Sequence, residues 1–336
     1  MSVEENTETV ATDILGEPWV AETIPVTDSP AAPGADRAVL VYQREAASEA
    51  QPRHTRAVLY IHGRNDYFFQ THMAQEFLDA GYEFYALDLR ACGRAGVGYY
   101  SPHDVRDLHI HDEEIAESLR IIREEHGHEM VVLHGHSTGG LQAVLWAGNH
   151  PGTVDAVVLN SPWLDVNASA FMRSFGSAFI DLVSRRDPER VLDNPDEAGD
   201  GDVYAHSLHS QWEGEWDWDL SLKPSPSFPV RAGFLAGVRR AQREVHHGLG
   251  IEVPVLVCCS TRTGSPDNPT IEEAQHADVV LSVEQIVERS QFLGDDVTVR
   301  QIPDGVHDLA LSGPQARAEF FSTMTGWLET RFGKAE

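Results

Sequence analysis

The sequence predicts an α/β fold in which a mostly parallel sheet is covered by helices and interrupted by one long helical insert. Residues 56–63 and 82–90 are near-continuous apolar runs, which are typical of strands buried on both faces of a sheet. Strand-like and helix-like stretches alternate along the chain, except within residues 163–250. We therefore expect a core formed by residues 17–162 and 251–332, with a lid or cap insertion at 163–250.

The elements before the insert follow from local patterning. Polar and acidic residues fill positions 1–16, which we expect to form a disordered leader. The stretch 104–127 predicts a long helix, because its apolar residues share one face. These residues are Leu108, Ile115, Leu119 and Ile122. The remaining strands are expected at 18–26, 37–43, 130–135 and 154–160, and the remaining helices at 73–81 and 138–150.

The alternation resumes after the insert and completes the predicted sheet. Strands are expected at 253–260 and 297–303, and each is followed by a helical stretch, at 283–294 and 314–331. Strands that are joined through helices run parallel, so this order implies a mostly parallel sheet with helices packed on it.

Composition excludes several classes of function. The chain has 336 residues and a formal net charge of −28, with 53 acidic and 25 basic residues. Such a surface repels phosphates and anionic headgroups, which argues against nucleic-acid partners and stable membrane insertion. The acidity fits either a charge-solubilised surface or a saline cytoplasm. Three cysteines without disulfide or zinc-site spacing, and no secretory signal or membrane-spanning run, predict a cytoplasmic protein.

A nucleophile motif lies between an expected strand and an expected helix. Residues 135–139 read Gly-His-Ser-Thr-Gly, and the motif needs a buried strand immediately before it and a helix immediately after it. Side chains at positions 135 and 139 would collide with the neighbouring strand and helix, which explains the two glycines. We predict that Ser137 is a nucleophile on a strained turn.

A serine nucleophile needs a histidine base, and the loop after the last strand supplies His307. It is one of 17 histidines. Those in or beside the predicted helix before the serine lie in the wrong part of the chain for a base, and we expect most of them at the surface. They are His103, His109, His111, His126 and His128. A further four fall in the insert, namely His206, His209, His246 and His247.

The base needs an orienting acid, which should follow strand 253–260. Asp278 is favoured because it is the last loop carboxylate before the next helix. Asp267 remains the alternative, with Glu272 and Glu273 behind it. The acids beside the base, Asp304 and Asp308, are too close in sequence to orient its ring, and Asp308 is interpreted as a local loop contact.

The oxyanion needs two backbone donors. One is expected from Thr138, which follows the nucleophile, and the other from Arg64, in the loop after strand 56–63. That loop opens with His62-Gly63, where glycine permits close approach. The pairs His134-x-His136 and His109-x-His111 lack a third ligand at suitable spacing, so neither a metal nor another cofactor is expected.

In this order, "HGRND", "LDLRACGRAG", "GHSTGG" and "GVHDL" resemble the α/β-hydrolase fold, over about residues 37–331. The resemblance is to serine hydrolases of the monoacylglycerol lipase, lysophospholipase and serine aminopeptidase S33 type. It implies a triad of Ser137, Asp278 and His307 and a structural role for Asp88–Gly93. The family's oxyanion loop reads His-Gly-x-Gly-Glu. Here Arg64-Asn65-Asp66 departs from that pattern, because it lacks the second Gly and the Glu. The departure argues against substrate binding of the kind that lipases use.

The insert is expected to act as a helical lid. Phe171, Phe175, Phe179, Leu182 and Val183 share one helical face, which predicts either lid packing or an acyl-binding wall over the serine. Substrate contacts are expected from His62, Gly63, His136, Phe171 and Phe175. We expect hydrolysis of carboxylic esters, lipid-like or small, such as monoacylglycerol. The alternatives are an aminopeptidase or amidase of the same fold, and a non-catalytic ligand-binding protein. Substrate preference and oligomeric state stay open.

Overall fold

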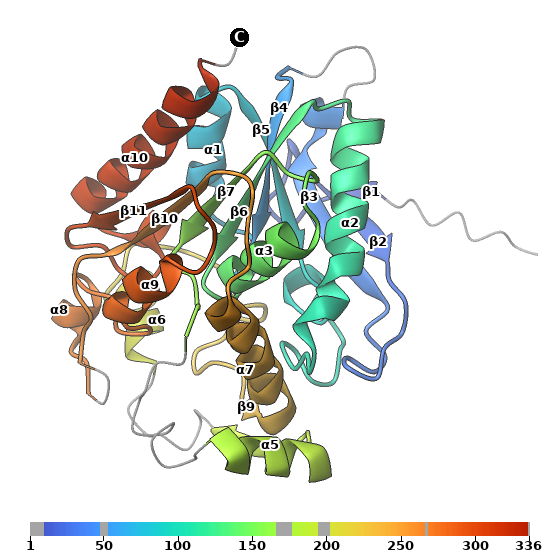
Figure 1. Cartoon of the computed structure of the whole chain (residues 1–336), viewed down its shortest axis with the longest axis vertical. Helices are drawn as coiled ribbons and strands as arrows, with labels where there is room; N and C mark the ends of the chain where they lie inside the picture. The colour runs from blue at the N-terminus through green and yellow to red at the C-terminus, as the bar shows by residue number, and fades with distance from the viewer. Residues whose placement is uncertain (1–9, 48–52, 166–176, 194–201, 266–267, 335–336) are drawn as a thin grey trace, which may run out of the picture.

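The computed structural model describes residues 10–47, 53–165, 177–193, 202–265 and 268–334. Its centre is a sheet in which six parallel strands continue into an antiparallel edge, in the order β1-β2-β3-β5-β4-β6-β7-β10-β11 (Figure 1). The bounds are β1 Val10–Thr12, β2 Trp19–Pro25, β3 Arg37–Gln43, β4 Arg56–Ile61, β5 Tyr82–Asp88, β6 Met130–His136, β7 Ala156–Asn160, β10 Val255–Ser260 and β11 Val297–Ile302.

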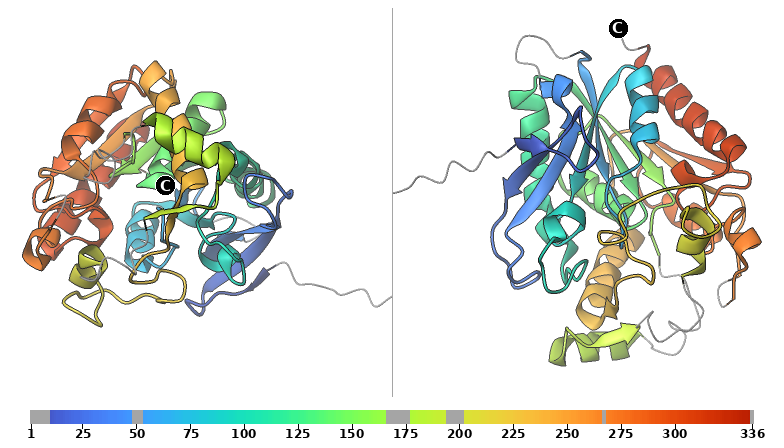
Figure 2. Two further views of the ribbon diagram at one scale, coloured as in Figure 1. Left: turned by 90° about the horizontal axis from the view of Figure 1, so that it is seen from below. Right: turned by 180° about the vertical axis from the view of Figure 1, so that it is seen from behind.

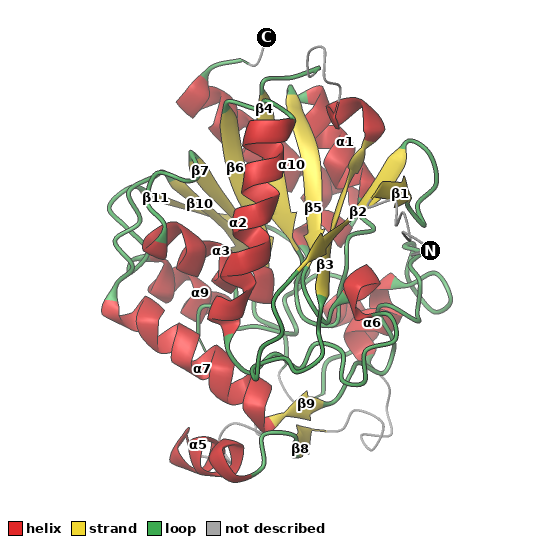
Figure 3. Ribbon diagram, turned by 90° about the vertical axis from the view of Figure 1, so that its right-hand side faces the viewer, coloured by secondary structure: helices red, strands yellow, loops and turns green. Residues whose placement is uncertain are grey.

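Helices cover both faces of the sheet, as Figure 3 shows. One face packs against α2 (Asp112–Arg120), α3 (Thr138–Asn149) and α9 (Val283–Ser290). The other packs against α1 (Thr71–Asp79) and α10 (Pro314–Phe332). The strands β4, β5 and β6 are buried on both faces, which accounts for their continuous apolar runs. None of the described helices combines the length and apolar character needed to cross a bilayer.

The predicted leader is too long. Residues 10–12 form β1, which pairs antiparallel with β2, so that Val10 lies opposite Glu22. Asp13 is buried and binds Arg94 through two contacts, at 2.5 and 2.8 Å. The prediction that residues 1–16 are disordered is therefore wrong for residues 10–16. The error arises because the edge of β2 offers backbone partners to a segment whose own sequence is too short and polar to indicate a strand.

The predicted helix 104–127 is shorter and irregular. A single turn, Leu108–His111, leads into α2, and the last turn, Ile121–Glu125, is π-helical. The face predicted to be apolar is buried at Leu108, Ile115, Leu119 and Ile122.

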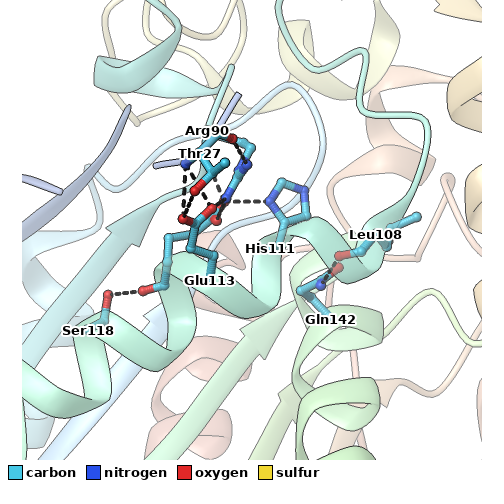
Figure 4. Close-up of polar contacts among 8 residues, drawn as sticks. Thr27, Arg90, Leu108, His111, Glu113, Ser118 and Gln142 are labelled. Carbon is cyan, nitrogen blue, oxygen red and sulfur yellow. Dashed lines mark hydrogen bonds and ion pairs between the residues drawn. The ribbon is translucent and has the colours of Figure 1, made fainter. Parts of the chain in front are cut away.

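Arg90, at the end of β5, ties α2 to the sheet (Figure 4). Its guanidinium lies 2.6 Å from the Glu114 carboxylate and 2.7 Å from that of Glu113, and it donates to the Thr27 carbonyl at 3.1 Å. Glu114 also pairs with His111 at 2.7 Å. Burial acts to raise the pKa of Glu114, but His111 and Arg90 outweigh it and lower the pKa to about 2. The carboxylate is thus held in its charged form at the centre of the network.

The chain between β7 and β10 forms the insert. Its described elements are α5 (Ser177–Arg186), β8 (Val191–Asp193), α6 (Val203–Leu208), β9 (Val230–Arg231) and α7 (Ala232–His247). The apolar face of α7 belongs to the main core, whereas α5 packs on α7 through Ile180. Figures 1 and 2 show α5 on the far side of α7 from the sheet. The insert is therefore anchored through α7.

Candidate active site

The turn between β6 and α3 is strained at Ser137. This residue has φ 53° and ψ −116°, a backbone conformation that non-glycine residues rarely adopt. A Cβ on Gly135 would lie 2.5 Å from the Gly139 carbonyl oxygen. One on Gly139 would lie 2.2 Å from the carbonyl oxygen of Ile61. Both glycines are therefore required sterically, for the reason that the sequence predicts.

Ser137, His307 and Asp278 form a continuous hydrogen-bonded chain. Ser137 Oγ lies 2.9 Å from His307 Nε2, and His307 Nδ1 lies 2.9 Å from Asp278 Oδ2. The other oxygen of Asp278 accepts from the backbone N–H groups of Val280 and Leu281, at 2.9 and 2.7 Å. All three side chains are buried. A carboxylate fixed in this way holds Nδ1 as the donor and leaves Nε2 to accept the serine hydroxyl proton.

The parallel sheet brings these residues together from distant parts of the chain. Ser137 follows β6, Asp278 lies in the loop after β10, and His307 follows β11. Carboxyl ends of parallel strands meet at one edge, so loops after β6, β10 and β11 converge there. Asp278 is drawn back to the sheet by pairing with Thr263, just beyond β10. The alternative acid, Asp267, lies outside the described residues.

The two predicted oxyanion donors flank Ser137 at the pocket. Thr138 is the first residue of α3, so its N–H has no carbonyl acceptor within that helix. Arg64 lines the same pocket. Gly63 allows this approach, because a Cβ there would lie 3.1 Å from Ser137 Cβ.

His62 and Gly63 are not among the residues that line this pocket, and the substrate contacts expected of them stay predictions. They border a separate small cavity behind the loop. His62 Nδ1 donates to the Gly63 carbonyl at 2.6 Å, and its Nε2 accepts from the Leu89 N–H at 3.2 Å. This histidine therefore orients the loop backbone. A histidine directly after a buried strand could either contact substrate or orient the loop, so its position in the sequence does not distinguish these two roles.

His136 lines the pocket, and the substrate contact expected of it stays a prediction. Its Nδ1 donates to the Asn160 carbonyl at 3.1 Å, and its ring centre lies 4.8 Å from that of His307. Burial lowers the pKa of His136, so the ring is neutral and Nε2 is left as an acceptor. The predicted lid contacts Phe171 and Phe175 lie outside the described residues.

The pocket has a volume of about 380 Å³ and two different walls. The apolar wall comes mainly from the insert and consists of Trp163, Val230, Phe234, Leu235, Val280 and Leu281. The polar wall includes Asp66, His136, Tyr204 and Lys223. The Lys223 ammonium lies 2.7 Å from Asp66 and within 5.2 Å of the ring centres of Phe69 and Trp218. Sequence reasoning missed Lys223, although it is one of only two lysines in the chain.

Within the part of the chain that the structure describes, Asp66, His136 and Asp308 lie close enough together to hold a metal ion. Each offers one ligand atom, and these atoms lie within 4.8 Å of one another. The Lys223 ammonium already lies against Asp66, so the charge of this carboxylate is balanced without a metal ion. Asp308 accepts from Gln70 and Asn160, at 3.0 and 2.7 Å. Asp308 also accepts from the Ala310 N–H at 3.1 Å, so the predicted local loop contact is present, and Gln70 and Asn160 add partners from distant segments.

The histidines that precede Ser137 are less exposed than predicted. His103, His111 and His128 are all buried. His111 pairs with Glu114, and His128 Nε2 lies 2.8 Å from the Tyr85 hydroxyl. His111 thus binds a residue on the next helical turn, and His128 binds one that is distant in the sequence. Composition alone reveals neither partner.

The fold is similar to that of several solved hydrolases. A carboxyl esterase from Bacillus coagulans, solved with glycerol, matches with a TM-score of 0.64 at 14% identity, covering 92% of this chain and 98% of that one. A soluble variant of monoglyceride lipase from Saccharomyces cerevisiae, solved with a substrate analogue, has a TM-score of 0.60 at 14% identity, covering 87% and 92%. A monoacylglycerol lipase from Paleococcus ferrophilus has 0.52 at 19%, covering 81% and 93%.

No curated protein sequence matches this chain significantly. A family model does match, however, over residues 52–265, which is well over half of the chain. That model describes the hydrolase family named serine aminopeptidase, S33. The match covers β4, the turn at Ser137, the insert and β10. The chain therefore belongs to the serine aminopeptidase S33 family of α/β-hydrolases.

Proposed function

We propose that this chain is a serine hydrolase that cleaves carboxylic esters through an acyl-enzyme. The observation that carries the proposal is the hydrogen-bonded chain from Ser137 through His307 to Asp278, at the wall of a mainly apolar pocket. A serine hydroxyl becomes a useful nucleophile only with such a base, and the base works only when an acid orients it.

In the proposed mechanism Ser137 Oγ attacks the ester carbonyl while His307 Nε2 takes its proton. The backbone N–H groups of Arg64 and Thr138 stabilise the oxyanion of the tetrahedral intermediate. His307 then gives the proton to the leaving alkoxide, which departs as the alcohol. A water molecule repeats the sequence on the acyl-enzyme and releases the acid. Asp278 stabilises the imidazolium at each stage, and the reaction needs no cofactor.

The state of the pocket carboxylates favours an ester over a peptide substrate. An aminopeptidase needs a carboxylate that is available to the substrate's terminal ammonium. Asp66 is paired with Lys223, and Asp202 accepts from the Ala205 N–H at the start of α6. Asp66 is therefore already paired with a cation, whereas Asp202 serves as the cap of α6. An aminopeptidase or amidase activity remains the second candidate, because the family carries that name.

The two walls of the pocket indicate a substrate with two unlike ends. An acyl chain would lie on the wall formed by Trp163, Phe234 and Leu235, and a hydroxylated alcohol would lie near Lys223 and Tyr204. A monoacylglycerol or a smaller acyl ester has this character. In this proposal residues 163–250 act as the lid, since much of the apolar wall comes from them.

A fluorophosphonate probe tests the proposal directly. It should label the wild-type chain and fail to label Ser137→Ala, and p-nitrophenyl esters of short to long acyl chains, together with a monoacylglycerol, should be hydrolysed. Equal labelling of both chains would sink the assignment of Ser137. Faster cleavage of aminoacyl anilides than of esters would favour the aminopeptidase. A correctly folded chain that neither reacts with the probe nor turns over any substrate would be a ligand-binding protein.

A further inference from the structure

Three consecutive residues after Gly63 bind one segment of the insert, residues 223–229. The Arg64 guanidinium donates to the carbonyls of Phe228 and Pro229, at 2.6 and 2.9 Å. Asp66 pairs with Lys223. Between them lies Asn65, whose side chain makes two hydrogen bonds to the same segment.

Asn65 is suited to this position by its backbone and by its amide. Its φ is 53°, in the left-handed region where asparagine is one of the few tolerated non-glycine residues. The side-chain Nδ2 donates to the Pro224 carbonyl at 3.0 Å, and Oδ1 accepts from the Phe228 N–H at 3.1 Å. Glycine could adopt the same backbone, but it could make neither side-chain contact. Asparagine therefore adds a connection that glycine at this place would lack.

His103 holds the backbone of Asn65 and also contacts the insert. Its Nδ1 accepts from the Asn65 N–H at 3.2 Å, and its ring stacks on Phe228 with centres 5.4 Å apart. Burial above all, with the positive charge of Arg64 nearby, holds the pKa of His103 well below its ordinary value. The ring is therefore neutral and able to accept this bond.

These contacts surround the peptide unit that carries the Arg64 N–H. The carbonyl of that unit belongs to Gly63 and accepts from His62 at 2.6 Å. The next peptide unit is held by His103, and the Asn65 side chain is held by the insert. Hydrogen bonds at Gly63 and at Asn65 thus fix the backbone on either side of the Arg64 N–H. Those of the Asn65 side chain depend on segment 223–229.

We propose that Asn65 is a positioning residue, which couples docking of segment 223–229 to the geometry of the oxyanion hole. The inference rests on the proposed function, in which the Arg64 N–H is an oxyanion donor. Asn65 also lines the pocket, but its two side-chain hydrogen bonds go to the insert and not to Ser137 or His307. It acts by fixing the loop, so that a donor aimed at the transition state does not have to reorganise during the reaction.

Two substitutions test the role. Asn65→Gly keeps a residue that tolerates positive φ and retains the N–H to His103, but removes both side-chain bonds. Asn65→Asp keeps the acceptor for Phe228 and loses the donor to Pro224. With a p-nitrophenyl ester, kcat should fall at least about tenfold in the glycine variant and less in the aspartate variant, with KM changed by about twofold or less. Inhibition by a trifluoromethyl ketone, which forms an oxyanion on Ser137, should weaken in parallel with kcat/KM.

Gln275→Ala provides a matched control. Gln275 is also a side-chain amide with two bonds to the insert, to the carbonyls of Ser207 and Glu213 at 3.3 Å each, but these partners lie outside segment 223–229. Its removal should leave kcat and the inhibitor affinity unchanged. Equal losses in Gln275→Ala and Asn65→Gly would reduce Asn65 to a general anchor of the insert and overturn the inference.

The outcome is separable from that of the proposed function. A wild-type chain that does not react with the fluorophosphonate refutes the proposed function. A reactive wild type with an equally active, folded Asn65→Gly variant refutes only the positioning role. Circular dichroism and thermal melting report folding. If the glycine variant does not fold, Asn65→Asp decides, because wild-type kcat and inhibitor affinity in that variant would also refute the role.

Discussion

At the scale of single residues, the site depends on how firmly each member of the proposed triad is held. Asp278 receives two backbone N–H bonds on one oxygen and presents the other to His307. Ser137 is held in a strained turn. His307 lies between them, buried and bonded at both ring nitrogens. This arrangement favours the tautomer of His307 that carries its proton on Nδ1, which leaves Nε2 able to accept the serine proton.

The choice of acid can be tested by two asparagine substitutions. Asp278→Asn removes the charge that holds Nδ1–H and stabilises the imidazolium, so kcat for an ester should fall by roughly 10³–10⁴-fold. The sequence alternative, Asp267→Asn, should retain activity close to that of the wild type. Steady-state kinetics on the two purified variants decides between them, and the reverse pattern would assign the acid to Asp267.

The sequence alone points to residues that lie in a recognisable local sequence context. Ser137 lies in a strand–glycine–helix context, and His307 follows the last strand. Lys223 has no such context, because its partner Asp66 is 157 residues away and comes close only through the folded insert. Asp308 and Gln70 are likewise 238 residues apart. Polar pairs of this kind depend on tertiary structure and leave no local periodicity.

At the scale of elements, the network around Arg90 fixes α2 against the sheet. Arg90 and Glu114 are both buried, so removal of one partner would leave an uncompensated charge. Arg90 and His111, which contact Glu114, lie in the chain between β5 and α2 (Figure 4). The same stretch includes His103, which binds the Asn65 N–H in the loop after β4. The stability of this helix and the order of the site are thus connected.

The lowered pKa of Glu114 predicts a specific loss of stability in acid. Its carboxyl has a pKa of about 2 in the fold, against an ordinary value of 4.5. A group whose pKa is lower when folded stabilises the protein above its unfolded pKa, and this contribution declines as the pH falls from about 4.5 towards 2. Glu114→Gln should therefore melt at a lower temperature than wild type at neutral pH, with the difference shrinking across that window.

Thermal melting from neutral pH down to about pH 2 measures the effect. Glu117→Gln is the control, because Glu117 lies on the same helix and pairs with Arg120 near the surface. An exposed pair contributes little, so the control should melt much as wild type does throughout. A constant gap between Glu114→Gln and wild type at every pH would contradict the electrostatic explanation.

The core strands and helices are predictable because each buries a face that its own pattern reveals. β4 and β5 are apolar apart from Arg56, Glu83 and Asp88, and α9 and α10 follow strands in the expected order. The error at β1 has a different origin. Its three residues lie at the sheet edge with partly exposed side chains, and pairing with β2 alone makes them a strand. The same limitation applies to β8 and β9, short strands that pair within the insert.

At the scale of the whole molecule, charge is the dominant unusual property. The chain carries 53 acidic residues against 25 basic ones. Arg90 and Arg94 each pair with two carboxylates, so several cations are already committed to buried networks. Much of the negative charge must therefore be balanced by solvent ions. Mutual repulsion of this kind destabilises the compact state.

Screening should accordingly stabilise the protein. Raising KCl from about 0.1 M to about 1 M shortens the Debye length from about 10 Å to about 3 Å, which weakens repulsion between surface carboxylates more than it weakens the buried pairs. The melting temperature should rise over this range, and NaCl should act like KCl because screening depends on ionic strength. A melting temperature that falls with both salts would show that the exposed ion pairs, and not the repulsion, dominate. A rise with only one of them would indicate binding of that cation in place of general screening.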